Sequence, residues 1–229
     1  IWADKSAFAI EEYIFARYYM YWNVYLHKTT RGFEKLVEAM WKRARQMHDD
    51  GWEMHLLRPI AHFWSTDQPS VQDFLALEEF TVLTQIQIWT SHIDKPLSDL
   101  ARRFLCREQL VVVDAPQVEA PLQLDLSEWE TALRELVGKH VEYDPPEMYC
   151  LKDTLKSKYS QPYFPEPEEG EQGVSNAIRL KRKTSTDPIE ISQHLPRLRP
   201  VTKKPPDRFR YYIPKDVRPE AEQLLRQFQ

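Results

Sequence analysis

Apolar and aromatic residues recur at intervals of three and four along the first part of the chain, which is the spacing of an amphipathic helix. Residues 8–48 include no proline and one glycine, and the spacing is carried by Ile10, Ile14, Tyr18, Tyr21, Trp22 and Tyr25. This pattern predicts either two helices or one helix with a bend near Gly32.

Helical spacing continues to about residue 105. Ser70 and Asp73 have the spacing of a capping box, and the apolar residues after them predict a helix of roughly 20 residues. Pro96 fits the first turn of the next helix. The apolar stripe of that helix consists of Leu97, Leu100, Ala101, Phe104 and Leu105.

The pattern changes after residue 108. Residues 110–114 (LVVVD) predict a short strand, and Ser127 with Glu130 predicts a second capping box and a helix that stops before Pro145. Strand-like pieces follow at 149–155, 178–180 and 189–191, and ten of the 17 prolines lie after residue 160. Residues 219–228 fit either a closing helix or a disordered end.

These patterns predict a mainly α fold in two parts. Residues 1–108 form the helical portion, and residues 109–229 form an α+β region with a Pro-rich irregular tail. A small antiparallel β element is expected in the last third of the chain.

Composition narrows the class of protein. The chain of 229 residues is 42% hydrophobic, which is enough for a sizeable core, and its net charge of −4 gives no general attraction to nucleic acid or to an anionic membrane. Two cysteines make no disulfide framework, and no apolar run reaches the roughly 18 residues of a membrane span. We expect a cytoplasmic protein without a membrane partner. The basic stretches 179–183 and 197–204 are typical of a solvated surface and do not specifically indicate nucleic acid.

The helix around Arg17 carries an unusual set of polar and aromatic side chains. At 100° per residue, Arg17, Tyr21, Tyr25 and Lys28 fall within an arc of roughly 80°. A guanidinium fork fits phosphate oxygens, and tyrosines pack on sugars or bases, so this face suits a nucleotide. The alternative is a core helix in which Arg17 pairs with a carboxylate: Asp4, Glu11 or Glu12.

Residues 15–44 (FARYYMYWNVYLHKTTRGFEKLVEAMWKRA) resemble the helix that follows the catalytic centre in HD-domain dNTP triphosphohydrolases. That helix carries Arg, seven residues, Tyr, one residue and then His-Lys, which are here Arg17, Tyr25, His27 and Lys28. Residues 88–95 (IWTSHIDK), 102–110 (RRFLCREQL) and 210–214 (RYYIP) also resemble bacterial members, so the similarity covers roughly residues 4–217.

The resemblance implies roles for individual residues. Arg17 would contact the triphosphate of a dNTP, Tyr25 would pack on its deoxyribose, and Tyr21 stands where some members have a phosphate-facing His. His27, Lys28 and Arg107 match positions that bind an effector nucleotide between subunits, which implies a homo-oligomer. Leu26 stands where some members have a Gln that discriminates against a 2′-hydroxyl on the sugar. Val111 stands where the animal member of this family has a Lys.

The family hydrolyses dNTPs with a divalent metal such as Mg²⁺ or Mn²⁺, held by an upstream His, a His-Asp pair and a later Asp. None of that region precedes Ile1, so this chain is expected to hold no metal, to provide no catalytic ligand and to be inactive alone. The dipeptide His48-Asp49 is interpreted as a solvated helix end.

Three hypotheses follow from the sequence. The first is that the chain is part of a metal-dependent phosphohydrolase that cleaves dNTPs to deoxynucleoside and triphosphate. The second is a non-catalytic, nucleotide-responsive oligomerisation module. The third is a structural helical domain without a ligand.

Overall fold

The computed structural model describes residues 2–116, 126–155, 163, 177–181, 187–202 and 208–228. The chain forms two compact units, each made from separate segments. Unit 1 comprises residues 1–30 and 154–209, and unit 2 comprises residues 31–153 and 210–229. The predicted division at residues 108/109 runs through unit 2, because residues 31–153 belong to one compact unit.

Unit 1 is built on α1 (Ala7–Met20), with short elements from the last third of the chain packed beside it. Its sheet has the order β1–β4–β5, in which β1 is parallel to β4 and β4 is antiparallel to β5. The strands are β1 (Trp2–Ala3), β4 (Arg179–Lys181) and β5 (Ile189–Glu190). The remaining elements are η1 (Asp4–Ser6), η2 (Tyr21–Tyr25), α9 (Ile191–His194), η4 (Pro196–Leu198) and α10 (Arg199–Thr202).

The core of unit 1 joins residues that are far apart in the sequence. Its buried members are Ala7, Ile14, Tyr163, Leu180, Ile191 and Leu198. A polar network lies beside these residues: the Tyr163 hydroxyl donates to Glu190 at 2.6 Å and accepts from the backbone N–H of Ile178 at 2.8 Å. Glu190 also caps the start of α9 by accepting from the N–H of Ser192. These bonds hold the late segments of unit 1 to one another.

Of the two alternatives for residues 8–48, the structure has two helices, and the alternative of one helix with a bend near Gly32 is wrong. The first helical region breaks at Leu26 and His27, between η2 and α2 (Lys28–Asp49), and Gly32 lies inside α2. Gly32 has a different role there, because a Cβ built on it would lie 3.0 Å from the ring of Tyr212. The absent side chain lets that ring approach the helix closely.

The helices of unit 2 follow one another along the chain. They are α2, α3 (Arg58–Ser65), α4 (Val71–Leu75), α5 (Glu79–Trp89) and α6 (Lys95–Leu105). The capping box of Ser70 and Asp73 is confirmed, but the predicted long helix is two helices, since residues 76–78 interrupt it. The start of α6 is also confirmed: Asp94 caps it and Pro96 lies in its first turn.

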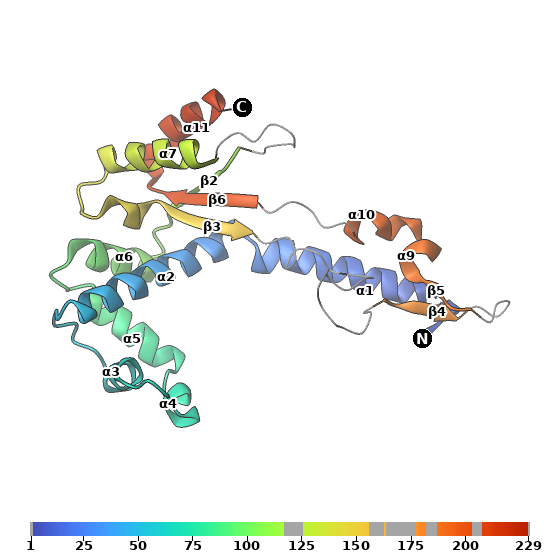
Figure 1. Cartoon of the computed structure of the whole chain (residues 1–229), viewed down its shortest axis with the longest axis horizontal. Coiled ribbons are helices and arrows are strands. Elements are labelled where there is room, and N and C mark those ends of the chain that lie inside the picture. Colours follow the sequence, from blue (N-terminus) through green and yellow to red (C-terminus); the bar gives the residue numbers. More distant parts are fainter. Residues whose placement is uncertain are drawn as a thin grey trace. The chain divides into compact units, whose positions relative to one another are not determined.

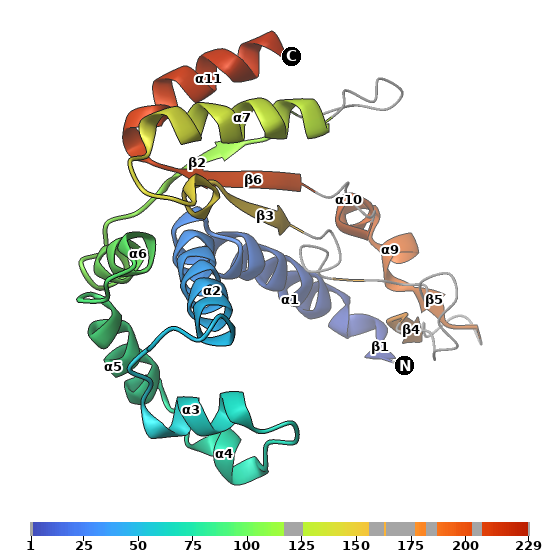
Figure 2. The same ribbon diagram turned by 60° about the vertical axis from the view of Figure 1, so that its left-hand side comes forward.

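A second sheet, with the order β2–β6–β3, places β6 between two strands from earlier in the chain (Figure 1). The strands are β2 (Val111–Asp114), β3 (Leu151–Leu155) and β6 (Arg208–Ile213), and β2 pairs antiparallel to β6 with Val111 opposite Ile213. Helix α7 (Leu126–His140) covers this sheet, and α11 (Arg218–Gln227) lies beside α7 (Figure 2). The short turns η3 (Pro146–Tyr149) and η5 (Lys215–Val217) complete the unit.

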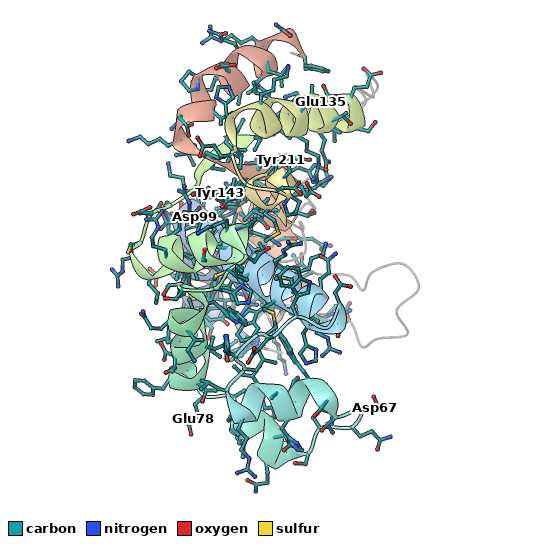
Figure 3. The ribbon with its side chains drawn as sticks, turned by 90° about the vertical axis from the view of Figure 1, so that its left-hand side faces the viewer. Asp67, Glu78, Asp99, Glu135, Tyr143 and Tyr211 are labelled. Atoms are coloured by element: carbon teal, nitrogen blue, oxygen red, sulfur yellow. The ribbon has the colours of Figure 1, made fainter. Side chains whose placement is uncertain are left out.

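Trp129 of α7 packs edge-on against Tyr211 of β6, with ring centres 4.9 Å apart. Figure 3 shows Tyr211 just below the α7 ribbon. Helix α7 already includes Leu126, so Ser127 lies within the helix rather than capping it. The predicted strands at 110–114 and 149–155 and the closing helix are present, and the predicted mainly α fold with small β elements is confirmed.

Carboxylates tie the parts of unit 2 together. Asp153 is fully buried and binds both Nε and Nη2 of Arg31, which joins β3 to α2. Glu130 of α7 accepts from the Tyr211 hydroxyl at 2.6 Å and also binds Lys152 and Arg134. Both carboxylates connect a helix with the β2–β6–β3 sheet.

We predict that Gly32→Ala lowers the free energy of unfolding by about 1 kcal/mol, because the new methyl group would press on the buried ring of Tyr212. Alanine normally stabilises a helix relative to glycine. A loss of stability in Gly32→Ala would therefore come from the contact with Tyr212 and not from helix propensity. Gly138→Ala in α7 is the control: its Cβ would meet Pro146 at 3.7 Å, and we expect a gain of about 0.5–1 kcal/mol. Urea unfolding measures both, and a gain for Gly32→Ala would contradict the packing.

A second prediction concerns pH. Burial would raise the pKa of Glu130, but hydrogen bonds from Lys152, Tyr211 and Arg134 outweigh burial and hold the pKa at about 2, below its ordinary 4.5. Ionised Glu130 therefore stabilises the folded state above pH 4.5, and this contribution is lost as the pH falls towards 2.

We expect the wild type to exceed Glu130→Gln in free energy of unfolding at neutral pH, and the difference to shrink as the pH falls. Urea unfolding of both proteins at about pH 7, 4.5 and 3 tests this. A difference that stays constant over this range would show that the Glu130 carboxylate gains nothing from its three partners.

Candidate functional site

Three side chains form a continuous row in unit 1, along the end of α1 and through η2. Arg17 Nη2 donates a hydrogen bond to the Tyr21 hydroxyl at 3.2 Å, and the Arg17 guanidinium carbon lies 5.0 Å from the centre of the Tyr21 ring. The rings of Tyr21 and Tyr25 are 5.3 Å apart between centres. The structure therefore brings together the three residues that the sequence assigned to substrate binding.

The row crosses a π-helical turn. In this turn the N–H of Leu26 donates to the carbonyl of Tyr21, five residues earlier, at 2.8 Å. Such turns are rare and occur frequently at functional sites. Tyr21 and Tyr25 stay adjacent through it, but Lys28 begins a new helix after the break. The prediction that Lys28 shares one helical face with Arg17 is therefore wrong, because a constant 100° per residue does not continue past η2.

The carboxylates near Arg17 in the sequence are used elsewhere. Glu11 is buried and pairs with Arg197 at 2.8 Å, and Asp4 lies 3.4 Å from His194. Among the described residues Arg17 forms no ion pair, and its buried Nε has no hydrogen-bond partner there. The alternative of a core arginine neutralised by Asp4 or Glu11 is thus not what the structure contains.

An indole on η2 and a second cation, from β6, lie next to each other in unit 1. Tyr18 and Trp22 pack edge-on at 6.2 Å between ring centres, and the guanidinium carbon of Arg208 lies 5.4 Å from the Trp22 ring. Sequence reasoning placed Trp22 in the helical spacing but gave neither Trp22 nor Arg208 a role in a site. No periodicity could have linked the two, because residue 208 reaches η2 only through the fold of unit 1.

His27 and Lys28 lie just after the row, and both are exposed. The N–H of Thr29 donates to His27 Nδ1 at 3.3 Å, so the His27 ring caps the first turn of α2. This bond uses Nδ1 as the acceptor and leaves Nε2 on the other side of the ring. His27 therefore has a structural role in addition to the effector role that the resemblance implies.

Arg107 belongs to unit 2 and ends α6 in a strained conformation. Its φ is +56°, and its N–H donates to the Phe104 carbonyl at 3.3 Å, while the Glu108 N–H donates to Arg103 at 2.8 Å. These two bonds form a Schellman motif, in which glycine is the preferred residue at the left-handed position. The motif holds an exposed arginine where glycine would be more stable.

Histidines in the described chain serve packing and capping. His92 accepts from the N–H of Asp94 at 3.0 Å, and His62 lies 3.0 Å from Asp73. His48 lies at the end of α2, where its ring packs edge-on against Trp64. Within the described ranges, no three His, Cys, Asp or Glu side chains are grouped so that they could hold a metal ion. The described residues therefore do not fit the metal that the family uses.

Comparisons with known proteins show a similar sequence and a solved structure with a similar fold. No protein-family model matches the chain. The chain is 30% identical over 235 residues to the "Uncharacterized protein YwfO" of Bacillus subtilis (strain 168). The matched region covers 98% of this chain and 50% of that protein. It is also similar to the crystal structure of a phosphohydrolase from Bacteroides thetaiotaomicron VPI-5482, with a TM-score of 0.66 and 19% identity, over 92% of this chain and 51% of that one.

The chain thus shares the mainly α fold of that solved phosphohydrolase, and it spans about half the length of the proteins that it matches. The prediction of a mainly α fold is confirmed. Of the helices that the structure describes, none is both long enough and apolar enough to cross a lipid bilayer.

We predict that Arg107→Gly raises the free energy of unfolding by up to about 1 kcal/mol, because glycine adopts a positive φ without strain. Arg107→Ala is the matched control, since it removes the same charge and keeps the strain, and we expect no gain from it. Thermal and urea unfolding of the three proteins separate the two effects. Equal stability of both variants would show that the backbone at Arg107 is unstrained.

Proposed function

We propose that the chain is part of a metal-dependent phosphohydrolase that cleaves dNTPs to deoxynucleoside and triphosphate, and that it contributes the wall that binds the substrate. The observation that supports this most directly is the row of Arg17, Tyr21 and Tyr25, in which Arg17 has no carboxylate partner among the described residues. The family resemblance and the phosphohydrolase fold point to the same class of activity.

Arg17 is proposed to bind the triphosphate. A guanidinium that is not neutralised by a carboxylate keeps its full charge for a phosphate group, and its planar fork matches two phosphate oxygens. The Tyr21 hydroxyl already accepts from Nη2, which fixes the fork beside the ring. Because the Tyr21 oxygen is the acceptor in this bond, its own O–H remains able to donate to a phosphate oxygen.

Tyr25 is proposed to pack on the deoxyribose. Its ring is 54% exposed and leans on Tyr21, so one ring face is available for a sugar. Leu26 is 7% exposed and belongs to the packed interior. A buried Leu26 cannot check for a 2′-hydroxyl as a glutamine would, so we assign discrimination between sugars to Tyr25.

The divalent metal, Mg²⁺ or Mn²⁺, is proposed only for a longer protein that includes this chain, because the described residues contain no ligand group for it. When bound, such a metal would activate the attacking water. The part proposed for this chain is to bind the triphosphate, to position the sugar and to neutralise charge.

We further propose that His27, Lys28 and Arg107 bind an effector nucleotide and that the protein assembles as a homo-oligomer. All three side chains are exposed. Unit 1 also exposes large apolar side chains, with Phe8, Tyr13, Tyr19 and Val24 each more than half exposed. Apolar surface of this kind commonly marks an interface, which supports assembly through α1.

The test is triphosphate release from each of the four dNTPs, with Mg²⁺ or Mn²⁺, by the longer protein and its variants. We expect Arg17→Ala to lower kcat/KM by about 100-fold or more, because one donor group to the reacting phosphates is lost. Arg17→Lys should recover part of the activity, since a point charge replaces the fork. Arg226→Ala, an exposed arginine on α11, is the control and should leave activity unchanged.

Each other outcome supports a different function. If no dNTP is hydrolysed but dNTPs still bind and change the oligomeric state, the chain belongs to a non-catalytic nucleotide-responsive module. If no nucleotide binds at all, it belongs to a structural helical domain. Full activity of Arg17→Ala would remove Arg17 from the substrate wall.

A further inference from the structure

A groove runs within unit 2 between α2 and the segment that contains η3 and β3. Its volume is about 300 Å³, at the lower end of the size of small-molecule sites. All residues that line it belong to unit 2, whereas Arg17, Tyr21 and Tyr25 belong to unit 1. The groove is therefore a different feature from the proposed substrate wall.

The lining of the groove is strongly positive although the chain as a whole carries a net charge of −4. Two of its side chains are carboxylates, Glu38 and Glu147. Five are cationic: Lys35, Lys42, Arg43, Arg134 and Lys152. Because these cations come from α2, α7 and β3, the fold gathers them from three separate stretches of sequence.

Carboxylates outside the lining hold several of these cations in place. Arg43 binds Asp94 through Nε at 3.3 Å and Nη2 at 2.6 Å, while Arg134 and Lys152 both bind Glu130. None of these carboxylates lines the groove. They order the cations in advance, which reduces the entropy that a bound anion would otherwise lose in ordering them.

Lys42 differs from the other four because it forms no ion pair with any residue that the structure describes. Its side chain is exposed, as are those of Arg134 and Lys152. Lys35 lies seven positions earlier on α2, and two helical turns place such residues on one side, about 10 Å apart along the axis. Two lysines at this spacing suit an extended chain of phosphates better than a single small anion.

The side of the groove formed by residues 145–151 is mainly apolar. It includes Pro145, Met148 and Leu151, and Ala39 of α2 lies in the same lining. A phosphate chain bound by the lysines would leave this side for an attached organic group. The combination of ordered cations and an adjoining apolar surface is typical of sites for phosphorylated small molecules.

We propose that this groove binds the phosphate chain of a small phosphate-bearing molecule, with Lys42 as the lining cation that pairs with no carboxylate in the part of the chain that the structure describes. Lys35 and Lys152 contact the chain beside it, and the apolar side accepts an attached nucleoside when one is present. The free polyphosphate and the nucleotide share the same recognition chemistry at the lysines.

The test is isothermal titration of the 229-residue chain with inorganic triphosphate and, separately, with ATP, at low ionic strength. Lys42→Glu is the test variant, because it reverses an exposed charge without removing a packing contact. We expect it to weaken binding of both ligands about tenfold or more. Lys95→Glu, an equal change at an exposed position of α6 outside the groove, is the matched control and should bind within about twofold of wild type.

Arg17→Ala separates this site from the proposed substrate wall and should leave triphosphate binding to the groove intact. Equal affinities for triphosphate and ATP would assign the binding to the phosphate chain alone, and tighter ATP binding would place the nucleoside on the apolar side. The proposal is overturned if neither ligand binds, if Lys95→Glu weakens binding as much as Lys42→Glu, or if only Arg17→Ala weakens it. If only Arg17→Ala weakens binding, the proposed function remains supported, but the proposal that the groove binds phosphate is rejected.

Discussion

The pair of Arg31 and Asp153 is the interaction on which the arrangement of unit 2 depends. Asp153 is fully buried, and a buried carboxylate without a partner would cost several kcal/mol, so α2 must present Arg31 to β3 at this point. With α2 fixed in this way, Gly32 faces the ring of Tyr212, and only a residue without a side chain fits between them. The same side of α2 then carries Lys35, Ala39 and Lys42 into the lining of the basic groove. One buried charge thus sets both a packing constraint and the position of a candidate site.

In unit 1 the important feature is a cation, Arg17, that forms no ion pair with any residue that the structure describes. Two acidic residues of unit 1 have other partners: Glu11 pairs with Arg197, and Glu190 binds Tyr163 and the start of α9. Among the described residues, Arg17 binds the hydroxyl of Tyr21, a neutral partner that orients the guanidinium without cancelling its charge. The π-turn that follows keeps Tyr25 beside Tyr21 and then ends the helix, so the row of three side chains stops where α2 begins.

The chain shares its backbone fold with about half of a solved phosphohydrolase, to which it is 19% identical in sequence. The proposed functions rest on side chains: an arginine that has no carboxylate partner among the described residues and lies beside two tyrosines in unit 1, and five cations around a groove in unit 2. Both features are suited to phosphate groups. In unit 1 a phenol orients the guanidinium, and in unit 2 carboxylates outside the groove order Arg43, Arg134 and Lys152.

The sequence by itself determined the mainly α class, the starts of α4 and α6 and the strands β2 and β3, because caps, prolines and apolar spacing act over a few residues. It left the end of the chain open between a helix and disorder, and the structure has the helix. The sequence also singled out Arg17, Tyr21 and Tyr25, which are close in the chain and therefore close in space. Only the tertiary structure decided the break at Leu26, the role of Gly32, the contact of Arg208 with Trp22 and the basic groove. Each of these depends on partners more than 100 residues apart or on a helical turn that departs from 100° per residue, and local periodicity contains no information about either.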